Sequence, residues 1–447
     1  MIALGRLASY SEELALEAIV PATLTQLVSL LSQENKYLRK AAVLVFRSVA
    51  KHSASLAQVV VDSKALESLV ECMKESSDHP LQESAIWAIG HVAKHSEALA
   101  SSVVSAGAVP ILLQTSCETD VTLKRISLSA LGDIARHSLE LAELVFSEGH
   151  LLPMLIKGID HEEAGVRRQA SACISQMVKH SAGLAKAVIE AGLFPKLILC
   201  LKDLNEHVRK NACASIRETV RQNEDMAKEV AASGAIAGIV EYVNDVDGVS
   251  RIPGIMCLGY VATYDSTLAS AVMISNSVPV LKSSLINEPE DCVKAATAWC
   301  LGELGRHTTE LANRLAEADI LRRLLAVFVH DSSSPDLRAK CKKSIKLVSA
   351  RASLLPVLNA LIPDAPPPIL KLVLRRIAML LADDPGGRKL FVQSGSLERI
   401  QKIACDPESK LHTHILEINK LFPEDLVNFY SPQYQEALLK RLDELPD

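Results

Sequence analysis

The chain has 447 residues, a net charge of -5 and a hydrophobic fraction of 49%, yet only 4% of its residues are aromatic. This charge excludes a strong overall field that would draw the protein to nucleic acid or to an anionic membrane, so we expect neither partner. No stretch approaches the roughly 18 apolar residues of a membrane span, and the N-terminus lacks a secretory signal, which predicts a soluble intracellular protein.

The first predicted element is the end of a long helix at residues 1–10, which lacks the two shorter helices that precede each later long helix. We therefore expect an incomplete first repeat and an N-terminally shortened form. From there a Leu-Ala or Met-Ala pair recurs at steps of 42 or 43 residues. The pairs begin at Leu14, Leu56, Leu99, Leu141, Leu184, Met226, Leu268 and Leu311. Such a regular period predicts one supersecondary unit that is copied and stacked as a solenoid.

The third unit indicates what the repeat contains. Residues 80–95 read PLQESAIWAIGHVAKH, with apolar residues at the spacing of a long amphipathic helix. A shorter helix follows and ends at Gly107, and a third helix begins at Pro110, whose missing N–H is tolerated in a first turn. Eight long helices are predicted, with ends near Tyr10, His52, His95, His137, His180, Gln222, Tyr264 and His307. Glycines inside five of them, at positions 5, 90, 132, 259 and 302, predict close approach between neighbouring helices.

This three-helix unit resembles the armadillo repeat more than the two-helix HEAT repeat. The resemblance rests on AIWAIGHVAKHS, which matches the family's pattern at Trp87 and Val92, and on the later stretch from Ala298 to Gly302. It implies an all-α, right-handed armadillo-repeat superhelical solenoid. We expect regular repeats over residues 1–312, then degenerate helical repeats and a C-terminal cap over residues 313–447.

The histidines that close the long helices raise the question of a metal site. Neighbouring helices pack about 10 Å apart, which is too far for a shared ion, so capping of helix carbonyls is favoured. Ten scattered cysteines without C-x-x-C spacing indicate small buried residues in a reducing compartment. No catalytic motif stands out, so we expect no enzyme activity, no cofactor and no metal.

Basic residues recur near the start of the long helices, and we call these ten the basic ladder. They are Arg39, Lys40, Lys124, Arg125, Arg167, Arg168, Arg209, Lys210, Arg251 and Lys294. Two interpretations stay open: a solvated face balanced by nearby carboxylates, or a surface for an acidic partner such as the tails of tubulin.

A second set, the groove column, occupies the position of His91 in each long helix. Its members are Arg6, Ser48, His91, Asp133, Gln176, Glu218, Tyr260 and Glu303. Nuclear-import adaptors, which resemble this fold, carry Asn at this position beside repeated Trp residues and bind an extended basic peptide. This chain has no Asn in the column and has Trp only at 87 and 299. It therefore lacks most of the side chains with which import adaptors bind their peptide.

Six longer motifs resemble the sperm-associated antigen 6 family. They are KRISLSALGDIARHS (124–138), SRIPGIMCLGYVA (250–262), AATAWCLGELGRHT (295–308), LPVLNALIPDAPPPILK (355–371), RKLFVQSGSLERIQ (388–401) and LVNFYSPQYQEALLKRLD (426–443). The resemblance implies a structural protein of the axonemal central pair in cilia and flagella, required for motility. Its implied partners are other central-apparatus proteins, microtubules and further copies of itself.

Two alternatives remain. One is an armadillo transport adaptor that binds a peptide in its concave groove, and the other is a soluble signalling adaptor or enzyme regulator. Localisation separates the axonemal scaffold from both.

Overall fold

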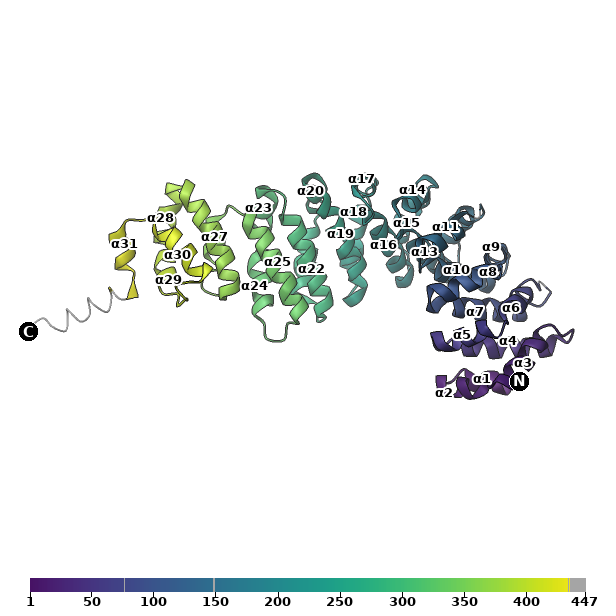
Figure 1. Cartoon of the computed structure of the whole chain (residues 1–447). Helices are drawn as coiled ribbons and strands as arrows, with labels where there is room; N and C mark the ends of the chain where they lie inside the picture. The colour runs from purple at the N-terminus through teal and green to yellow at the C-terminus, as the bar shows by residue number, and fades with distance from the viewer. Residues whose placement is uncertain (76, 148, 433, 435–447) are drawn as a thin grey trace, which may run out of the picture. The chain divides into compact units, whose positions relative to one another are not determined.

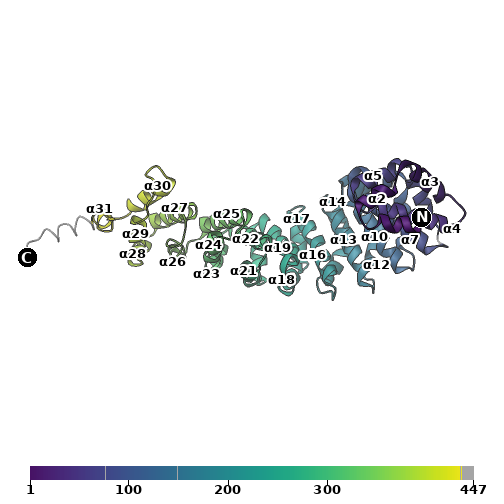
Figure 2. The same cartoon turned by 90° about the horizontal axis from the view of Figure 1, so that it is seen from below.

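A computed structural model describes residues 1–75, 77–147, 149–432 and 434, and every regular element within those ranges is helical. The chain forms two compact units, Met1–Ser233 and Gly234–Asp447. Within each unit the helices follow the predicted order of a short, a medium and a long helix, repeated along the chain (Figures 1 and 2). The predicted three-helix unit is therefore confirmed.

In the first unit, the long helices pack side by side in chain order, each against the next. They are α1 (Ile2–Ala8), α4 (Lys36–Ala50), α7 (His79–His95), α10 (Val121–Ala135), α13 (Ala164–Val178) and α16 (Glu206–Val220). The short helices are α2 (Glu12–Ala18), α5 (Ala54–Asp62), α8 (Glu97–Ser105), α11 (Leu139–Ser147), α14 (Ala182–Glu190) and α17 (Glu224–Ala232). The medium helices are α3 (Pro21–Leu31), α6 (Leu66–Met73), α9 (Ala108–Ser116), α12 (Leu151–Ile159) and α15 (Leu193–Cys200).

The second unit continues the pattern. Its regular part contains α18 (Ala235–Asp245), η1 (Gly248–Arg251), α19 (Ile252–Tyr264), α20 (Ser266–Ile274), α21 (Ser277–Asn287), α22 (Asp291–Gly305), α23 (Thr309–Glu317), α24 (Ile320–Val329) and α25 (Pro335–Arg351). Less regular helices follow: α26 (Leu355–Asn359), α27 (Pro367–Asp383), α28 (Pro385–Gln393), α29 (Ser396–Gln401), α30 (Lys410–Asn419) and α31 (Glu424–Phe429). The eight long helices predicted from the sequence end within about two residues of the predicted positions.

The repeat extends further than the eight predicted long helices. The helix α25 packs against α22 as a ninth long helix, with α23 and α24 as its short and medium partners. The predicted division at residue 312, between regular and degenerate repeats, remains a prediction. So does the C-terminal cap, because α31 has no buried residue and residues 433 and 435–447 lie outside the described part.

A side-chain cap explains why each short helix begins where it does. The residue before the helix accepts a hydrogen bond from the backbone N–H three residues later, which is the Leu or Met of the recurring pair. These caps are Ser11, Ser53, Ser96, Ser138, Ser181, Asn223, Asp265 and Thr308. The alanine of every pair is fully buried, so the periodic pair marks both a helix start and a core position.

The glycines that recur within the long helices have a packing reason at four of the five positions. A Cβ atom on Gly5 would lie 2.9 Å from the side chain of Leu44, and one on Gly132 would lie 3.3 Å from the Cα of Cys173. At Gly259 the ring of Trp299 occupies the space, and at Gly302 the hydroxyl and the Cα of Ser344 do. Gly90 is the exception, since its nearest neighbour, the Cβ of Ala130, lies at an ordinary 3.4 Å.

Within the described residues, no single helix has both the length and the apolar content to cross a membrane. Three pairs of helices that meet at a sharp bend reach that length and composition together.

Candidate interaction surfaces

The histidines at the ends of the long helices join each repeat to the one before it. Each Nε2 lies 2.7 or 2.8 Å from a carbonyl oxygen near the end of the preceding long helix, and a carbonyl only accepts, so Nε2 carries the proton. The pairs are His52 with Ala8, His95 with Ala50, His137 with Ala93, His180 with Ala135 and His307 with Ala262. Gln222 binds Val178 in the same way at 2.8 Å. The predicted capping function is confirmed, and the capped carbonyl belongs to the neighbouring repeat.

No group of three or more His, Cys, Asp or Glu side chains in the described ranges is arranged to hold a metal ion. The cysteines lie mainly inside the helices, as expected, with seven buried and Cys117 and Cys292 exposed.

Half of the basic ladder binds groups within the chain. Arg167 makes a two-pronged contact with Asp203, at 2.6 and 3.0 Å, and also donates to the carbonyls of His161 and Glu162. Burial acts to raise the pKa of the Asp203 carboxyl, but the hydrogen bond from Arg167 holds that pKa below its usual value. Arg209 donates to the carbonyl of Asp203 at 2.9 Å. Arg167 therefore joins the loop before its own long helix to the neighbouring repeat, whereas Arg209 binds only the loop before its own helix.

Three further members behave in the same way. Arg39 lies 3.3 Å from Glu75, and Lys40 lies 2.9 Å from Asp78. In the second unit, Arg251 lies 3.0 Å from Glu288 and donates to Ser284 at 2.9 Å.

The other half of the ladder has no such contact. Among the described residues, five half-buried side chains make no hydrogen bond or ion pair, and we call them the free cations: Lys124, Arg125, Arg168, Lys210 and Lys294. The ladder therefore contains cations that bind groups of the chain itself and cations that are available to an acidic partner, so each interpretation of the sequence applies to half of it.

Most residues of the groove column are buried or half-buried, and several of them contact neighbouring side chains of the chain. In the first unit, Asp133 lies 3.5 Å from Arg136, and Glu218, which is buried, binds Arg217 and Arg221. Gln176 accepts from Lys179 at 2.9 Å. Burial raises the pKa of the Asp133 carboxyl, although Arg136 acts in the opposite direction.

In the second unit, the buried Glu303 lies 2.6 Å from Arg306, and Tyr260 meets the edge of Trp299 with 5.1 Å between ring centroids. The remaining two members of the groove column belong to the first unit, where Ser48 is buried and Arg6 is exposed.

His91 belongs to an aromatic and cationic stack on Trp87. The two rings are stacked 5.3 Å apart, and the guanidinium of Arg47 lies 5.4 Å from the centroid of the Trp87 ring. Burial, helped by the charges of Arg47 and Lys94, lowers the pKa of His91 to about 4. The chain's own side chains therefore cover the tryptophan, and one of them is already a cation.

Sequence reasoning treated one set of charges only as helix caps. A cation comes directly before each terminal histidine and before Gln222, and in the first unit these cations are exposed or half-buried. They are Lys51, Lys94, Arg136, Lys179 and Arg221. Burial lowers the pKa of Lys179, and the positive charges of Arg136 and Arg221 add to that shift, so neighbouring members are close enough to interact. The regular spacing of these residues was visible in the sequence.

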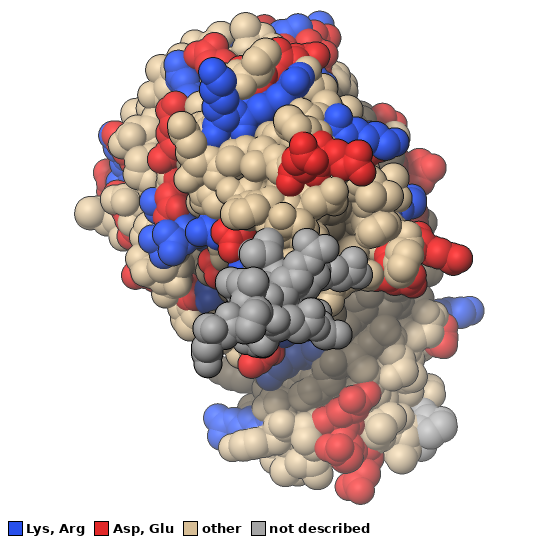
Figure 3. Space-filling model, turned by 90° about the vertical axis from the view of Figure 1, so that its left-hand side faces the viewer, with Lys and Arg blue, Asp and Glu red and all other residues tan. Residues whose placement is uncertain are grey.

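Figure 3, which views the end of the chain that carries α31, shows basic and acidic side chains interspersed on that face.

Residues 53–94 match the family of armadillo/beta-catenin-like repeats. This segment of the chain is an armadillo repeat. Over 165 residues it is 44% identical to sperm-associated antigen 6 of Mus musculus and equally to that of Homo sapiens. The matched segment is 37% of this chain and 32% of either relative, so it spans about a third of their length. The predicted relationship to sperm-associated antigen 6 is confirmed over that segment.

Solved structures show the same fold. An engineered protein superimposes with a TM-score of 0.73 at 17% identity, over 94% of this chain and 93% of the other. A designed armadillo repeat protein in complex with the peptide (KR)4 superimposes with a TM-score of 0.51 at 21% identity, over 53% of this chain and 98% of the other. At these identities the likeness concerns the fold alone, and it confirms the predicted all-α armadillo solenoid.

Proposed function

We propose that this armadillo-repeat scaffold is a non-enzymatic structural protein of the axonemal central apparatus in cilia or flagella, where it contributes to motility. The observation that carries the proposal is the 44% identity to sperm-associated antigen 6 over 165 residues. Its proposed partners are other central-apparatus proteins, the microtubule and further copies of the chain, and its proposed location is the axoneme. A stacked repeat offers a long surface to several partners and requires no cofactor.

The free cations support an acidic partner. A half-buried lysine or arginine without a carboxylate of its own is partly desolvated, so an incoming acidic group gains a charge-assisted hydrogen bond there. Acidic tails on the microtubule surface have this chemistry. We propose that Arg168 and Lys210 on α13 and α16 contribute to such a contact, together with Lys124 and Arg125. Lys294 is the corresponding candidate in the second unit, although its charge already acts on Asp291. Groove-column residues His91, Asp133, Gln176, Glu218, Tyr260 and Glu303 are the second candidate surface.

Localisation of the tagged full chain tests the proposal. We expect the signal to line the axoneme of a motile cilium and to remain there after detergent extraction. A diffuse cytosolic or nuclear signal, or complete release by detergent, would contradict it and would favour the soluble signalling adaptor.

The acidic partner is tested with charge reversals at two adjacent positions. Arg168→Glu should weaken sedimentation with microtubules and leave the melting temperature unchanged, because Arg168 has no partner side chain among the described residues. Arg167→Glu should lower the melting temperature instead, since it places a second carboxylate beside Asp203. If Arg168→Glu binds microtubules as well as the unmodified chain does, the contact is not made there.

The transport adaptor is the second candidate function. It requires a basic peptide to occupy the face of Trp87, where Arg47 already lies. Calorimetric titration with a lysine-rich localisation peptide should therefore give no binding. Micromolar affinity in that titration would revive the adaptor.

A further inference from the structure

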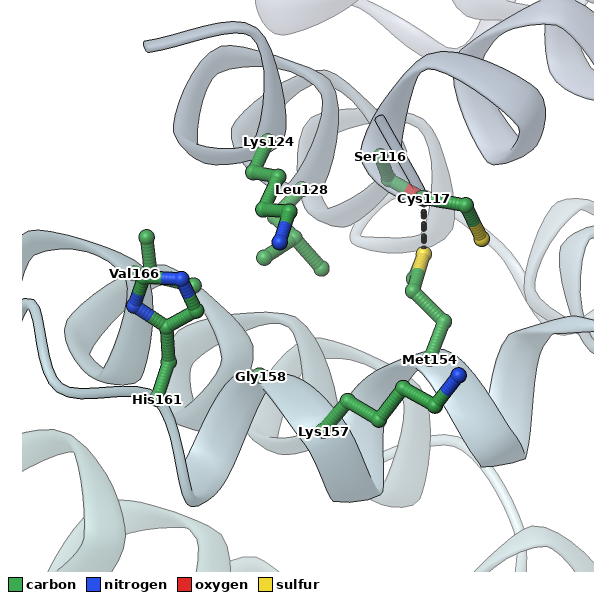
Figure 4. A pocket seen from close by; sticks show the side chains of 9 residues that line it. All are labelled: Ser116, Cys117, Lys124, Leu128, Met154, Lys157, Gly158, His161 and Val166. Atoms are coloured by element: carbon green, nitrogen blue, oxygen red, sulfur yellow. Dashed lines mark hydrogen bonds between the residues drawn. The ribbon is translucent and has the colours of Figure 1, made fainter. Parts of the chain in front are cut away.

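A small hollow lies between α10 and α12 in the first unit (Figure 4). Its volume is about 50 Å³, and it is partly open to solvent. Its floor is apolar and includes Leu128, Met154 and Val166, while Lys124, Lys157 and His161 lie around it. The hollow therefore combines an apolar floor with three side chains that carry nitrogen donors.

In three other repeats of the first unit, the equivalent place holds a carboxylate from the chain itself. Asp203 accepts from Arg167, and Glu75 lies 3.3 Å from Arg39. In the repeat just before the hollow, Glu118 accepts from Gln82 at 3.4 Å. In each case a side chain near the start of a long helix reaches the acidic residue that follows the medium helix of the next repeat.

The repeat that contains the hollow lacks this carboxylate. His161 lies eight residues after Pro153, as Asp203 lies eight residues after Pro195, so His161 takes the place of the acid. Lys124 takes the place of the arginine, since it lies fourteen residues before the cap Ser138, as Arg167 does before Ser181. The nearby Asp160 is paired with Lys196 at 2.5 Å and does not line the hollow.

The medium helix α12 packs closely against α13 beside the hollow. Gly158 is the equivalent of Cys72 and Cys200 in other repeats, and a Cβ on it would lie 3.0 Å from the Cβ of Ala170. The pair that a carboxylate of the chain closes in those three repeats is therefore open here.

The donors around the hollow are unused. His161 Nδ1 accepts the backbone N–H of Glu163 at 3.1 Å, so its proton is on Nε2, which is free to donate. Within the described part of the chain, neither that Nε2 nor the amino group of Lys124 or Lys157 makes a hydrogen bond or ion pair. In Figure 4, Lys124 extends from its helix into the space between His161 and Lys157.

We propose that the hollow bounded by Lys124, Lys157 and His161 binds a glutamate or aspartate side chain of a partner polypeptide, which takes the place that Glu75, Glu118 and Asp203 fill in other repeats. The apolar floor receives the methylene groups of that side chain, Lys124 and the Nε2 of His161 bind its carboxylate, and the exposed Lys157 adds positive charge at the rim. The inference rests on the proposed scaffold function only in taking the ligand to be part of a protein. It is tested by binding in vitro, so it can fail while the axonemal location holds.

The probe is a fluorescein-labelled peptide of alternating glutamate and serine, and its binding to the full chain is followed by fluorescence anisotropy at low salt. A peptide of alternating glutamine and serine is the uncharged control. The decisive variant is His161→Asp, which restores an internal carboxylate beside Lys124. We expect it to weaken peptide binding about tenfold or more while the melting temperature stays the same or rises.

Lys124→Met should weaken binding to a similar extent. Lys186→Met, which removes one exposed lysine of α14 far from the hollow in sequence, is the matched control and should bind within about twofold of the unmodified chain. Binding that His161→Asp leaves unchanged would overturn the proposal. So would equal binding of the glutamine peptide, or complete displacement of the glutamate peptide by millimolar inorganic phosphate, which would assign the hollow to a phosphate group.

Discussion

At the scale of single residues, the terminal histidines do more than close their own helices. The last carbonyls of an α-helix have no partner within that helix, and an unpaired carbonyl in a packed interface is costly. His137 supplies a donor to Ala93 of the previous repeat, and Gln222 does the same for Val178. Histidine and glutamine thus place a hydrogen-bond donor at the same position of the repeat. This indicates that the position requires the hydrogen bond and not the charge of an imidazole.

This gives a matched pair of substitutions. His137→Ala should lower the free energy of unfolding by about 1 to 3 kcal/mol, because the carbonyl of Ala93 loses its donor. His137→Gln should retain most of the stability, as Gln222 does naturally. Urea denaturation followed by circular dichroism measures both, and equal losses in the two variants would mean that the ring's packing, rather than its hydrogen bond, matters.

His91 predicts a pH dependence of stability. Its pKa is lowered to about 4 by burial and by the neighbouring cations, whereas an unfolded histidine titrates near 6.5. The unfolded chain therefore binds the proton more readily, and the stability that is present above pH 6.5 is lost as the pH falls toward 4. In His91→Gln that acid-dependent loss should be smaller by about 1 to 3 kcal/mol.

Urea denaturation at a series of pH values provides the measurement. His207→Gln, at an exposed histidine on α16, controls for the mere loss of an imidazole. Parallel pH profiles for His91→Gln and the unmodified chain would refute the prediction.

At the scale of elements, the distance between neighbouring long helices is set by what each helix places opposite the next. The sequence predicted close approach at five glycines alike, but the spaces differ. Only the facing residue decides whether a methyl group fits, and that residue lies about one repeat away in the sequence.

Gly302→Ala and Gly90→Ala separate the two cases. A methyl group on Gly302 would lie 2.6 Å from the hydroxyl of Ser344 and 3.0 Å from its Cα, so we expect a loss of about 1 to 3 kcal/mol. At Gly90 the contact is an ordinary 3.4 Å, and the better helix propensity of alanine should leave stability unchanged or raise it by up to about 1 kcal/mol. Thermal denaturation ranks the two variants, and a reversed order would contradict the assignment of close packing.

At the scale of the whole molecule, stacking removes most of the thiols from solvent. Seven of the ten cysteines are buried, and burial raises the pKa of Cys173 and Cys341 to about 12 and that of Cys200 to about 11. A thiol that is both inaccessible and protonated reacts slowly.

We therefore expect iodoacetamide to modify Cys117 and Cys292 rapidly in the native chain, and the seven buried cysteines only on unfolding. Mass spectrometry of proteolytic peptides identifies the modified sites, and the same reaction in urea is the control. Modification of Cys173 as fast as Cys117 would mean that the repeats open readily.

The period of the Leu-Ala pairs, together with the apolar spacing and the Gly and Pro positions within a unit, was enough to predict the repeat, its three helices and the ends of the long helices, because each of these depends on residues within a few turns of one another. Tertiary structure alone decided which cations of the basic ladder are free. Arg167 and Arg168 are indistinguishable in the sequence, but one faces Asp203 and the other does not. The same holds for the hollow at Lys124, where a missing carboxylate is recognised only once the neighbouring repeat is in place. Local pattern fixes helices, whereas the contacts of a long side chain depend on a residue that lies some 36 positions away.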